Sequence, residues 1–140
     1  MQLSEGPPPQ PDRLALRREV GLLRQRESRR RFDSSLSVGV PGGGHDGFVV
    51  RAGDLPVIDA ALRVEVVAAM LEGAAPEWRT AWLTRAGDVE PRDAELDWLR
   101  AAATAFAMHG RALDGFFVVT RTGWRDVRTG EQRVWKRLRL

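Results

Sequence analysis

The stretch GWRDVRTGEQRVWKRLRL, residues 123–140, decides how the carboxyl end of this chain folds. It follows FFVVTRT, residues 116–122, and both parts are rich in the aromatic and β-branched residues that favour strands. Within it, DVRTGE, residues 126–131, is typical of a turn, and Gly130 suits a position with positive φ. The pattern predicts a β-hairpin with strands at 116–124 and 132–140.

The length of the loop sets the register of this hairpin. If residues 127–130 form the loop, two residues pair when their numbers add up to 257. Aliphatic side chains then gather on one face, in the pairs Val119–Leu138, Phe117–Leu140 and Gly123–Val134. The other face receives indole and guanidinium groups, in the pairs Trp124–Arg133, Thr122–Trp135, Thr120–Arg137 and Val118–Arg139. A slip by one residue would mix the two sets, which supports this register.

The Trp/Arg face of the hairpin presents Trp124, Trp135, Arg133, Arg137 and Arg139, and it has three interpretations. A helix could cover the indoles and leave the arginines as solvated charge that protects the sheet edge. An exposed face could instead bind a protein partner, because Trp and Arg dominate interaction hot spots. It could also stack bases and contact phosphates of single-stranded nucleic acid.

The amino-terminal part divides into a leader and a basic helix. Residues 1–11, MQLSEGPPPQP, are rich in proline and are expected to be disordered. A helix over residues 12–32, capped by Asp12, would place three apolar residues on one face, namely Leu16, Val20 and Leu23. We expect this helix to dock onto the body of the protein or onto a second subunit. Its last turns form a basic end with Arg24, Arg26, Arg29, Arg30 and Arg31.

Residues 33–47, DSSLSVGVPGGGHDG, predict a flexible Ser/Gly-rich linker between this helix and the body. The segment PGGGHDG, residues 41–47, is glycine-rich like a phosphate-binding loop. However, it lacks the Lys-Ser/Thr pair of that motif and precedes a predicted strand instead of opening a helix. We therefore interpret the whole stretch as a linker.

The body, residues 48–140, alternates strands and helices. The pattern predicts a strand at 48–51, a helix at 54–72 capped by Asp54, a strand at 80–85 and a helix between Pro91 and Gly110. The expected buried faces of the two helices are Ile58, Leu62, Val66 and Met70, and Leu96, Leu99, Ala103 and Phe106. With the hairpin, the order β-α-β-α-β-β predicts a single α+β domain with helices on one face of a four-stranded sheet.

Charge is distributed unevenly along the 140 residues, whose net charge is +3. Residues 1–31 carry a net charge of +4, residues 32–120 carry −6, and residues 121–140 carry +5. Basic ends of this kind can contact an anionic partner, or they can fold back on the acidic middle of the same chain. The sequence leaves both possibilities open.

No pattern of residues specifies a catalytic or metal-binding chemistry. The chain has no cysteine, and its two histidines, His45 and His109, are not joined by acidic residues at the spacing of a known metal site. Asp93, Glu95 and Asp97 lie early in the predicted third helix, where acidic side chains complement the helix dipole. We therefore expect no cofactor, no metal ion and no catalytic site.

These observations favour a small, non-enzymatic accessory protein of the cytoplasm. The sequence has neither a pattern typical of a secretory signal nor an apolar run long enough for a membrane helix. We expect the chain to bind a protein partner, or a second copy of itself, through the basic helix and the Trp/Arg face. The alternative is a nucleic-acid-binding module that uses the same residues, although the acidic middle would repel phosphates.

Overall fold

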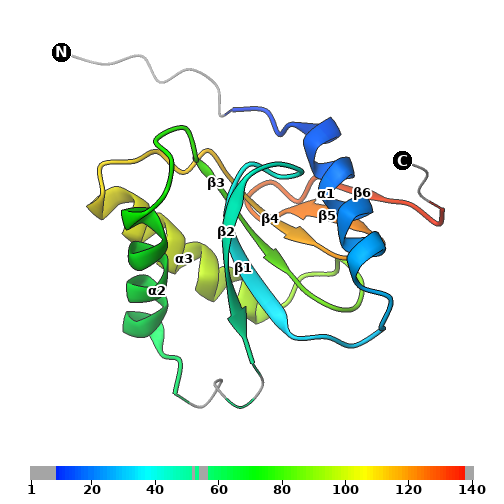
Figure 1. Ribbon diagram of the computed structural model, residues 1–140, viewed down its shortest axis with the longest axis horizontal. Helices are drawn as coiled ribbons and strands as arrows, with labels where there is room; N and C mark the ends of the chain where they lie inside the picture. Colours follow the sequence, from blue (N-terminus) through cyan, green and yellow to red (C-terminus); the bar gives the residue numbers. More distant parts are fainter. Residues whose placement is uncertain (1–8, 52, 54–56, 138–140) are drawn as a thin grey trace.

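The computed structural model describes residues 9–51, 53 and 57–137 (Figure 1). Over these residues, three helices and six strands form an α+β fold. The helices are α1 (Arg13–Arg26), α2 (Ala60–Glu72) and α3 (Asp93–Met108). The strands are β1 (Ser34–Gly39), β2 (His45–Val50), β3 (Thr80–Thr84), β4 (Gly115–Val119), β5 (Gly123–Asp126) and β6 (Gln132–Val134). The predicted disorder of residues 1–8 and the predicted cap at Asp54 lie outside the described residues.

The six strands form one mixed sheet in the order β2-β1-β3-β4-β5-β6. β1 pairs antiparallel with β2 and β3, and β5 pairs antiparallel with β4 and β6. The central pair, β3 and β4, is parallel, because α3 carries the chain from the end of β3 back to the start of β4.

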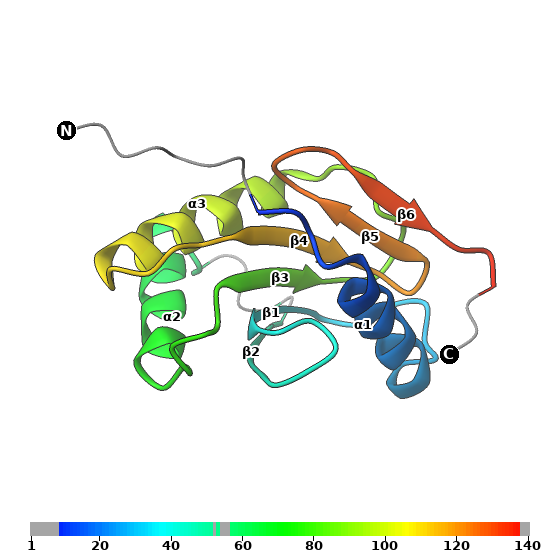
Figure 2. The ribbon, with the colours of Figure 1, turned by 90° about the horizontal axis from the view of Figure 1, so that it is seen from above.

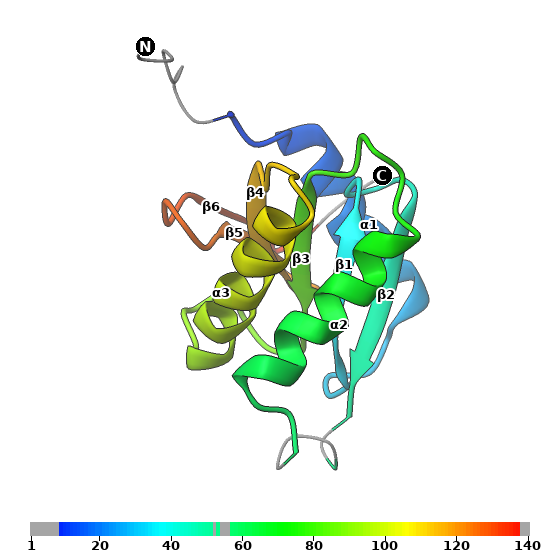
Figure 3. The same ribbon diagram turned by 90° about the vertical axis from the view of Figure 1, so that its left-hand side faces the viewer.

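Helices cover both faces of the sheet, as Figures 2 and 3 show. α2 and α3 lie side by side on one face, over a core that includes Phe116 and Trp98. α1 lies on the other face and buries Leu16, Val20 and Leu23 there. The prediction of helices on one face is therefore incomplete, because it did not place α1. Of the two docking sites that the sequence left open for this helix, the body of the same chain is the one that the structure shows.

The Ser/Gly-rich stretch 33–47 is a β-hairpin, so its prediction as a linker is wrong. Its residues form β1, a tight turn and the start of β2. The turn is fixed to α1, because the buried Glu19 accepts a hydrogen bond from the Gly42 N–H at 2.9 Å. Gly42 has a φ of 74°, and a Cβ there would press on the Arg18 side chain. The small residues of this stretch thus permit close approach to a helix.

The predicted strand at 116–124 is two strands, β4 and β5, joined by a turn. The Thr122 N–H donates to Thr120 Oγ1 at 3.2 Å, and the Thr120 N–H donates to the Gly123 carbonyl at 2.9 Å. Val119 consequently pairs with Thr84 of β3 and with Trp124 of β5. Residues 117–119 thus pair with β3 and β5 on their two edges, which contradicts the predicted pairs of these residues, whose predicted partners 138–140 lie outside the described residues. Because of this turn and of β1, the sheet has six strands where four were predicted.

The final hairpin keeps the predicted register over its described residues. β5 and β6 pair as Gly123–Val134, Trp124–Arg133 and Arg125–Gln132. The Asp126 N–H donates to the Glu131 carbonyl at 2.7 Å and so closes the predicted loop at 127–130, in which Gly130 has a φ of 83°. A Cβ on Gly123 would collide with the carbonyl oxygen of Arg133, so β6 can approach β5 only because this residue is glycine.

The buried face of α2 matches the prediction only in part. The helix is capped by Asp59, which accepts a hydrogen bond from the Leu62 N–H at 2.8 Å. Its fully buried residues are Val67, Met70 and Leu71, so only Met70 of the predicted four is fully buried. Residues spaced by four drift around a helix by about 40° per step. A row of four such residues therefore leaves the buried face.

The buried face of α3 is rotated from the predicted one and consists of Glu95, Trp98, Ala101, Ala102, Ala105 and Phe106. Phe106 was predicted correctly, but Leu96 is 46% exposed and Ala103 is exposed. The predicted face differs from the observed one because a hydrophobic pattern treats every carboxylate as facing solvent, whereas Glu95 is buried. The three buried alanines let α2 and α3 pack closely.

Replacing a core residue of α1 tests whether this helix is an integral layer of the fold. We expect Leu16→Ala, at a residue 1% exposed, to lower the free energy of unfolding by about 2–5 kcal/mol. Leu22→Ala, on the same helix but 37% exposed, serves as the control and should cost below about 1 kcal/mol. Urea unfolding followed by tryptophan fluorescence measures both, and equal losses would contradict the docking of α1.

Candidate functional site: a Trp–Arg groove and a buried Arg–Glu cluster

A groove between α1 and the last hairpin brings together residues from both ends of the chain, and we call it the Trp–Arg groove. Its volume is about 380 Å³. It is lined by Arg13, Leu14 and Arg17 of α1, and by Trp124, Glu131, Gln132, Arg133 and Trp135 of the hairpin. The lining contains three arginines and one glutamate, so the groove is basic.

Trp124, predicted on an exposed face, is buried beneath α1 and is only 1% exposed. It packs in the cluster that contains the apolar residues of α1, and its ring meets that of Phe117 edge-on, with centroids 6.0 Å apart. Its indole Nε1 is buried and has no hydrogen-bond partner among the described residues. The two interpretations that need an exposed indole therefore do not hold for Trp124. For this residue, the interpretation in which a helix covers the indole is confirmed.

Trp135 and Arg133 form the part of the predicted face that stays accessible. Trp135 is half-buried, and the guanidinium carbon of Arg133 lies 5.6 Å from the centroid of its ring, which is a cation–π contact. Across the groove, Arg13 donates two hydrogen bonds to Glu131, from Nε at 2.7 Å and from Nη2 at 3.1 Å. This bidentate ion pair ties the start of α1 to the end of the hairpin loop.

The five arginines that were predicted as a basic helix end do not line this groove; they are Arg24, Arg26, Arg29, Arg30 and Arg31. The helix ends at Arg26, so the last three follow it. Arg26 lies 3.5 Å from the carboxylate of Glu19, and Arg29 lies 2.8 Å from that of Glu27. The hydrogen bond from Arg29 lowers the pKa of Glu27 to about 2. Two of the predicted cations are thus already paired within the chain.

Two further predicted arginines follow β6. Arg137 is exposed, and Arg139 lies outside the described residues. The sequence analysis missed the contribution of α1 to the groove, although a signal was present. Arg13 and Arg17 are spaced by four and share one side of the helix, and Leu14 beside them is 76% exposed. An apolar residue off the buried face, next to two cations, indicates a second contact surface.

A second candidate site is a buried cluster of Arg85, Glu95 and Arg125, which the sequence analysis did not identify. Arg85 follows β3, Glu95 lies in the first turn of α3, and Arg125 lies on β5. Arg85 Nη2 donates to Glu95 Oε1 at 2.6 Å, and Arg125 Nη2 donates to Oε2 of the same carboxylate. The backbone N–H of Arg92 also donates to Oε2, at 3.2 Å. The prediction that Glu95 only complements the helix dipole is therefore incomplete.

Backbone carbonyls of the loop between β3 and α3 surround the two guanidiniums. Arg85 donates to the carbonyls of Ala86, Asp88 and Glu90, and Arg125 donates to the carbonyl of Val89 at 2.6 Å. Burial lowers the pKa of Arg85 below its ordinary value, while the hydrogen bond with Glu95 acts in the opposite direction. The cluster thus joins β3, β5, α3 and this loop.

No group of three or more His, Asp or Glu side chains that could hold a metal ion occurs within the described ranges. His45 Nδ1 lies 3.0 Å from the Gly43 carbonyl, and His109 Nδ1 lies 3.1 Å from the Ala105 carbonyl. Each of these two ring nitrogens thus contacts a backbone carbonyl close to it in the sequence. Among the described helices, none combines the length and the apolar character that crossing a membrane requires.

Comparisons with protein-family models, curated proteins and solved structures found no match to this chain.

Glu95→Gln tests the role of the buried carboxylate. Without the negative charge, two buried guanidiniums face each other, and we expect the free energy of unfolding to fall by about 3–5 kcal/mol. Asp93→Asn removes an exposed acidic group from the same helical turn, so it is the matched control and should cost about 0.3–1 kcal/mol. Chemical denaturation measures both changes. Equal effects of the two variants would show that Glu95 acts only on the helix dipole.

Proposed function

We propose that this chain is a small accessory protein that binds an acidic segment of a protein partner in the Trp–Arg groove. The observation that carries the proposal is the convergence of Arg13, Arg17 and Arg133 around Trp135, from elements at opposite ends of the chain. The basic lining of the groove attracts carboxylates and raises the rate of encounter. The half-buried indole and the exposed Leu14 supply apolar surface for the side chains between those carboxylates.

A protein partner fits this groove better than single-stranded nucleic acid does. Binding without sequence preference to a single strand uses aromatic rings on which successive bases stack. One of the two candidate rings, that of Trp124, lies beneath α1, so only Trp135 offers an accessible ring in the groove. The ring of Trp135 is already in a cation–π contact with the Arg133 guanidinium. An aromatic ring beside an arginine is typical of the residues that dominate protein interfaces.

The proposal can be tested by selecting displayed random peptides on the full-length chain. We expect the enriched peptides to be acidic and to carry at least one apolar side chain. We also expect Arg133→Glu to weaken their binding about tenfold or more, because a carboxylate would then face carboxylates. Arg100→Glu is the matched control, since this exposed arginine of α3 does not line the groove. Fluorescence anisotropy of labelled peptides measures the affinities at two salt concentrations.

The same assay separates the other possible occupants of the groove. Enrichment of peptides without acidic residues, or equal binding by the Arg133→Glu and Arg100→Glu variants, would contradict the proposal. Tighter binding of a labelled oligothymidylate than of the acidic peptides, lost in Arg133→Glu, would assign the groove to nucleic acid. A dimer in sedimentation velocity that dissociates in Arg133→Glu would assign it to a second copy of the chain.

A further inference from the structure

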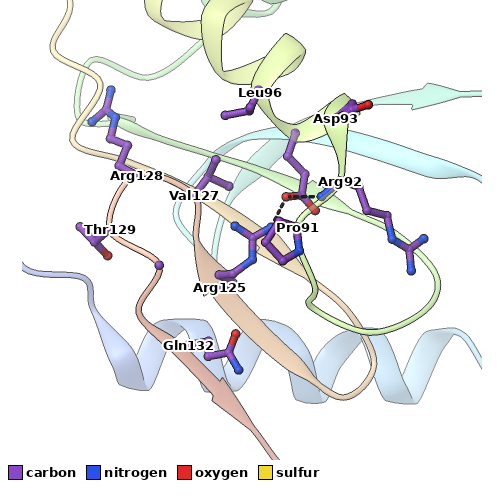
Figure 4. Close-up of a pocket in the computed structure, with 11 residues that line it drawn as sticks. Pro91, Arg92, Asp93, Leu96, Arg125, Val127, Arg128, Thr129 and Gln132 are labelled. Carbon is purple, nitrogen blue, oxygen red and sulfur yellow. Dashed lines mark hydrogen bonds and ion pairs between the residues drawn. The ribbon is translucent and has the colours of Figure 1, made fainter.

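A cavity lies on the other side of the last hairpin, between its loop and the start of α3 (Figure 4). Its volume is about 500 Å³, which is within the range of small-molecule sites. Pro91 and Leu96 line it from the side of α3, and Arg125 and Val127 line it from the side of β5. Thr129 and Gln132 add polar groups from the hairpin loop and from β6. We call it the Arg125 cavity.

The wall formed by Arg125 is a buried guanidinium that shares its carboxylate partner, Glu95, with Arg85. The Arg125 side chain is 6% exposed, and its Nε and Nη2 donate to the Val89 carbonyl and to Glu95. Its Nη1 has no partner among the described residues. The second guanidinium of the cluster, Arg85, directs all three of its nitrogens to Glu95 and to loop carbonyls. Two buried cations thus share one buried anion, which leaves one positive charge beside the cavity.

The neighbouring charged side chains have other partners or face solvent, and the buried Asp126 carboxylate accepts hydrogen bonds from the Arg128 and Thr129 N–H groups. Arg92 and Arg128 add further positive charge to the lining, and the guanidinium of Arg92 lies 3.6 Å from the Asp88 carboxylate. Arg128 Nη1 donates to the Leu113 carbonyl at 2.8 Å. Asp93 is the acidic residue of the lining besides Glu95, and it is exposed to solvent, where its charge is screened. A bound anion would therefore lower the electrostatic cost of the buried cluster.

We propose that the Arg125 cavity binds a small organic monocarboxylate. Its carboxylate accepts a hydrogen bond from Arg125 Nη1, and its apolar body covers the exposed part of Leu96 and the half-buried Val127. One carboxylate offsets the positive charge that two guanidiniums sharing the Glu95 carboxylate leave in the cluster. An inorganic phosphate has no apolar body and would leave the apolar walls uncovered. This cavity shares Gln132 with the Trp–Arg groove but is otherwise lined by different residues, so its ligand can be tested independently of the proposed function.

The probe for this proposal is benzoate, titrated into the full-length, isotope-labelled chain and followed by two-dimensional NMR. We expect saturable shifts of the backbone amides of Leu96, Val127 and Thr129, and weaker binding of acetate, which lacks an apolar body. Inorganic phosphate is the comparison anion. Tighter binding of phosphate than of benzoate, an absence of saturable shifts, or shifts centred on Trp135 would each overturn the proposal.

Two variants separate binding in the cavity from a general effect of charge. Leu96→Glu places a carboxylate in the wall and should weaken benzoate binding about tenfold or more. Met108→Glu, at an exposed apolar residue of the same helix that does not line the cavity, should bind like the unchanged chain. Arg125→Lys keeps the charge that Glu95 needs but has one nitrogen in place of three and lacks the Nη1 donor, so it should also bind more weakly. Unchanged binding by Leu96→Glu would overturn the proposal even if Arg125→Lys failed to fold.

Discussion

The arrangement of this protein depends most on the ion pairs that the Glu95 carboxylate makes with Arg85 and Arg125. This carboxylate lies in the interior between guanidiniums from the ends of the parallel strand β3 and of the hairpin strand β5. A buried ion pair of this kind contributes little net stability against apolar packing, but it is costly to break and tolerates few geometries. It therefore sets the rotation of α3 on the sheet and the path of the loop before it. It also aims Arg125 at the cavity for which we infer an anionic ligand.

The second face of the sheet depends on apolar packing instead. α1 covers two buried tryptophans, Trp82 and Trp124, with a narrow row of aliphatic residues, and neither indole N–H has a hydrogen-bond partner among the described residues. By burying one of the two candidate indoles, the helix leaves Trp135 as the accessible ring of the groove. Arg13 and Arg17 of this helix line the same groove as the remaining indole, that of Trp135. Thus the same packing that completes the fold creates the Trp–Arg groove, and the two inferred sites lie on opposite faces of one hairpin.

Sequence patterns predicted the elements that depend on local chemistry. The docking row of α1, the register of β5 against β6 and the positive φ of Gly130 follow from periodicity and turn composition, which a short segment contains by itself. Elements that depend on distant contacts were missed. The stretch 33–47 has the composition of a linker, yet β1 forms because β2 and β3 pair with its two edges. The turn after Val119 was hidden, because threonine suits both a strand and a turn.

The sequence by itself thus determined the class of fold, the basic ends, the acidic middle and the presence of Trp and Arg near the carboxyl end. Only the tertiary structure decided which of these side chains are accessible and which carry uncompensated charge. The physical reason is that exposure and electrostatic balance are properties of an environment assembled from several segments. Trp124 and Glu95 illustrate this most clearly, since a helix that begins more than a hundred residues earlier covers the first, and arginines of two different strand ends hold the second.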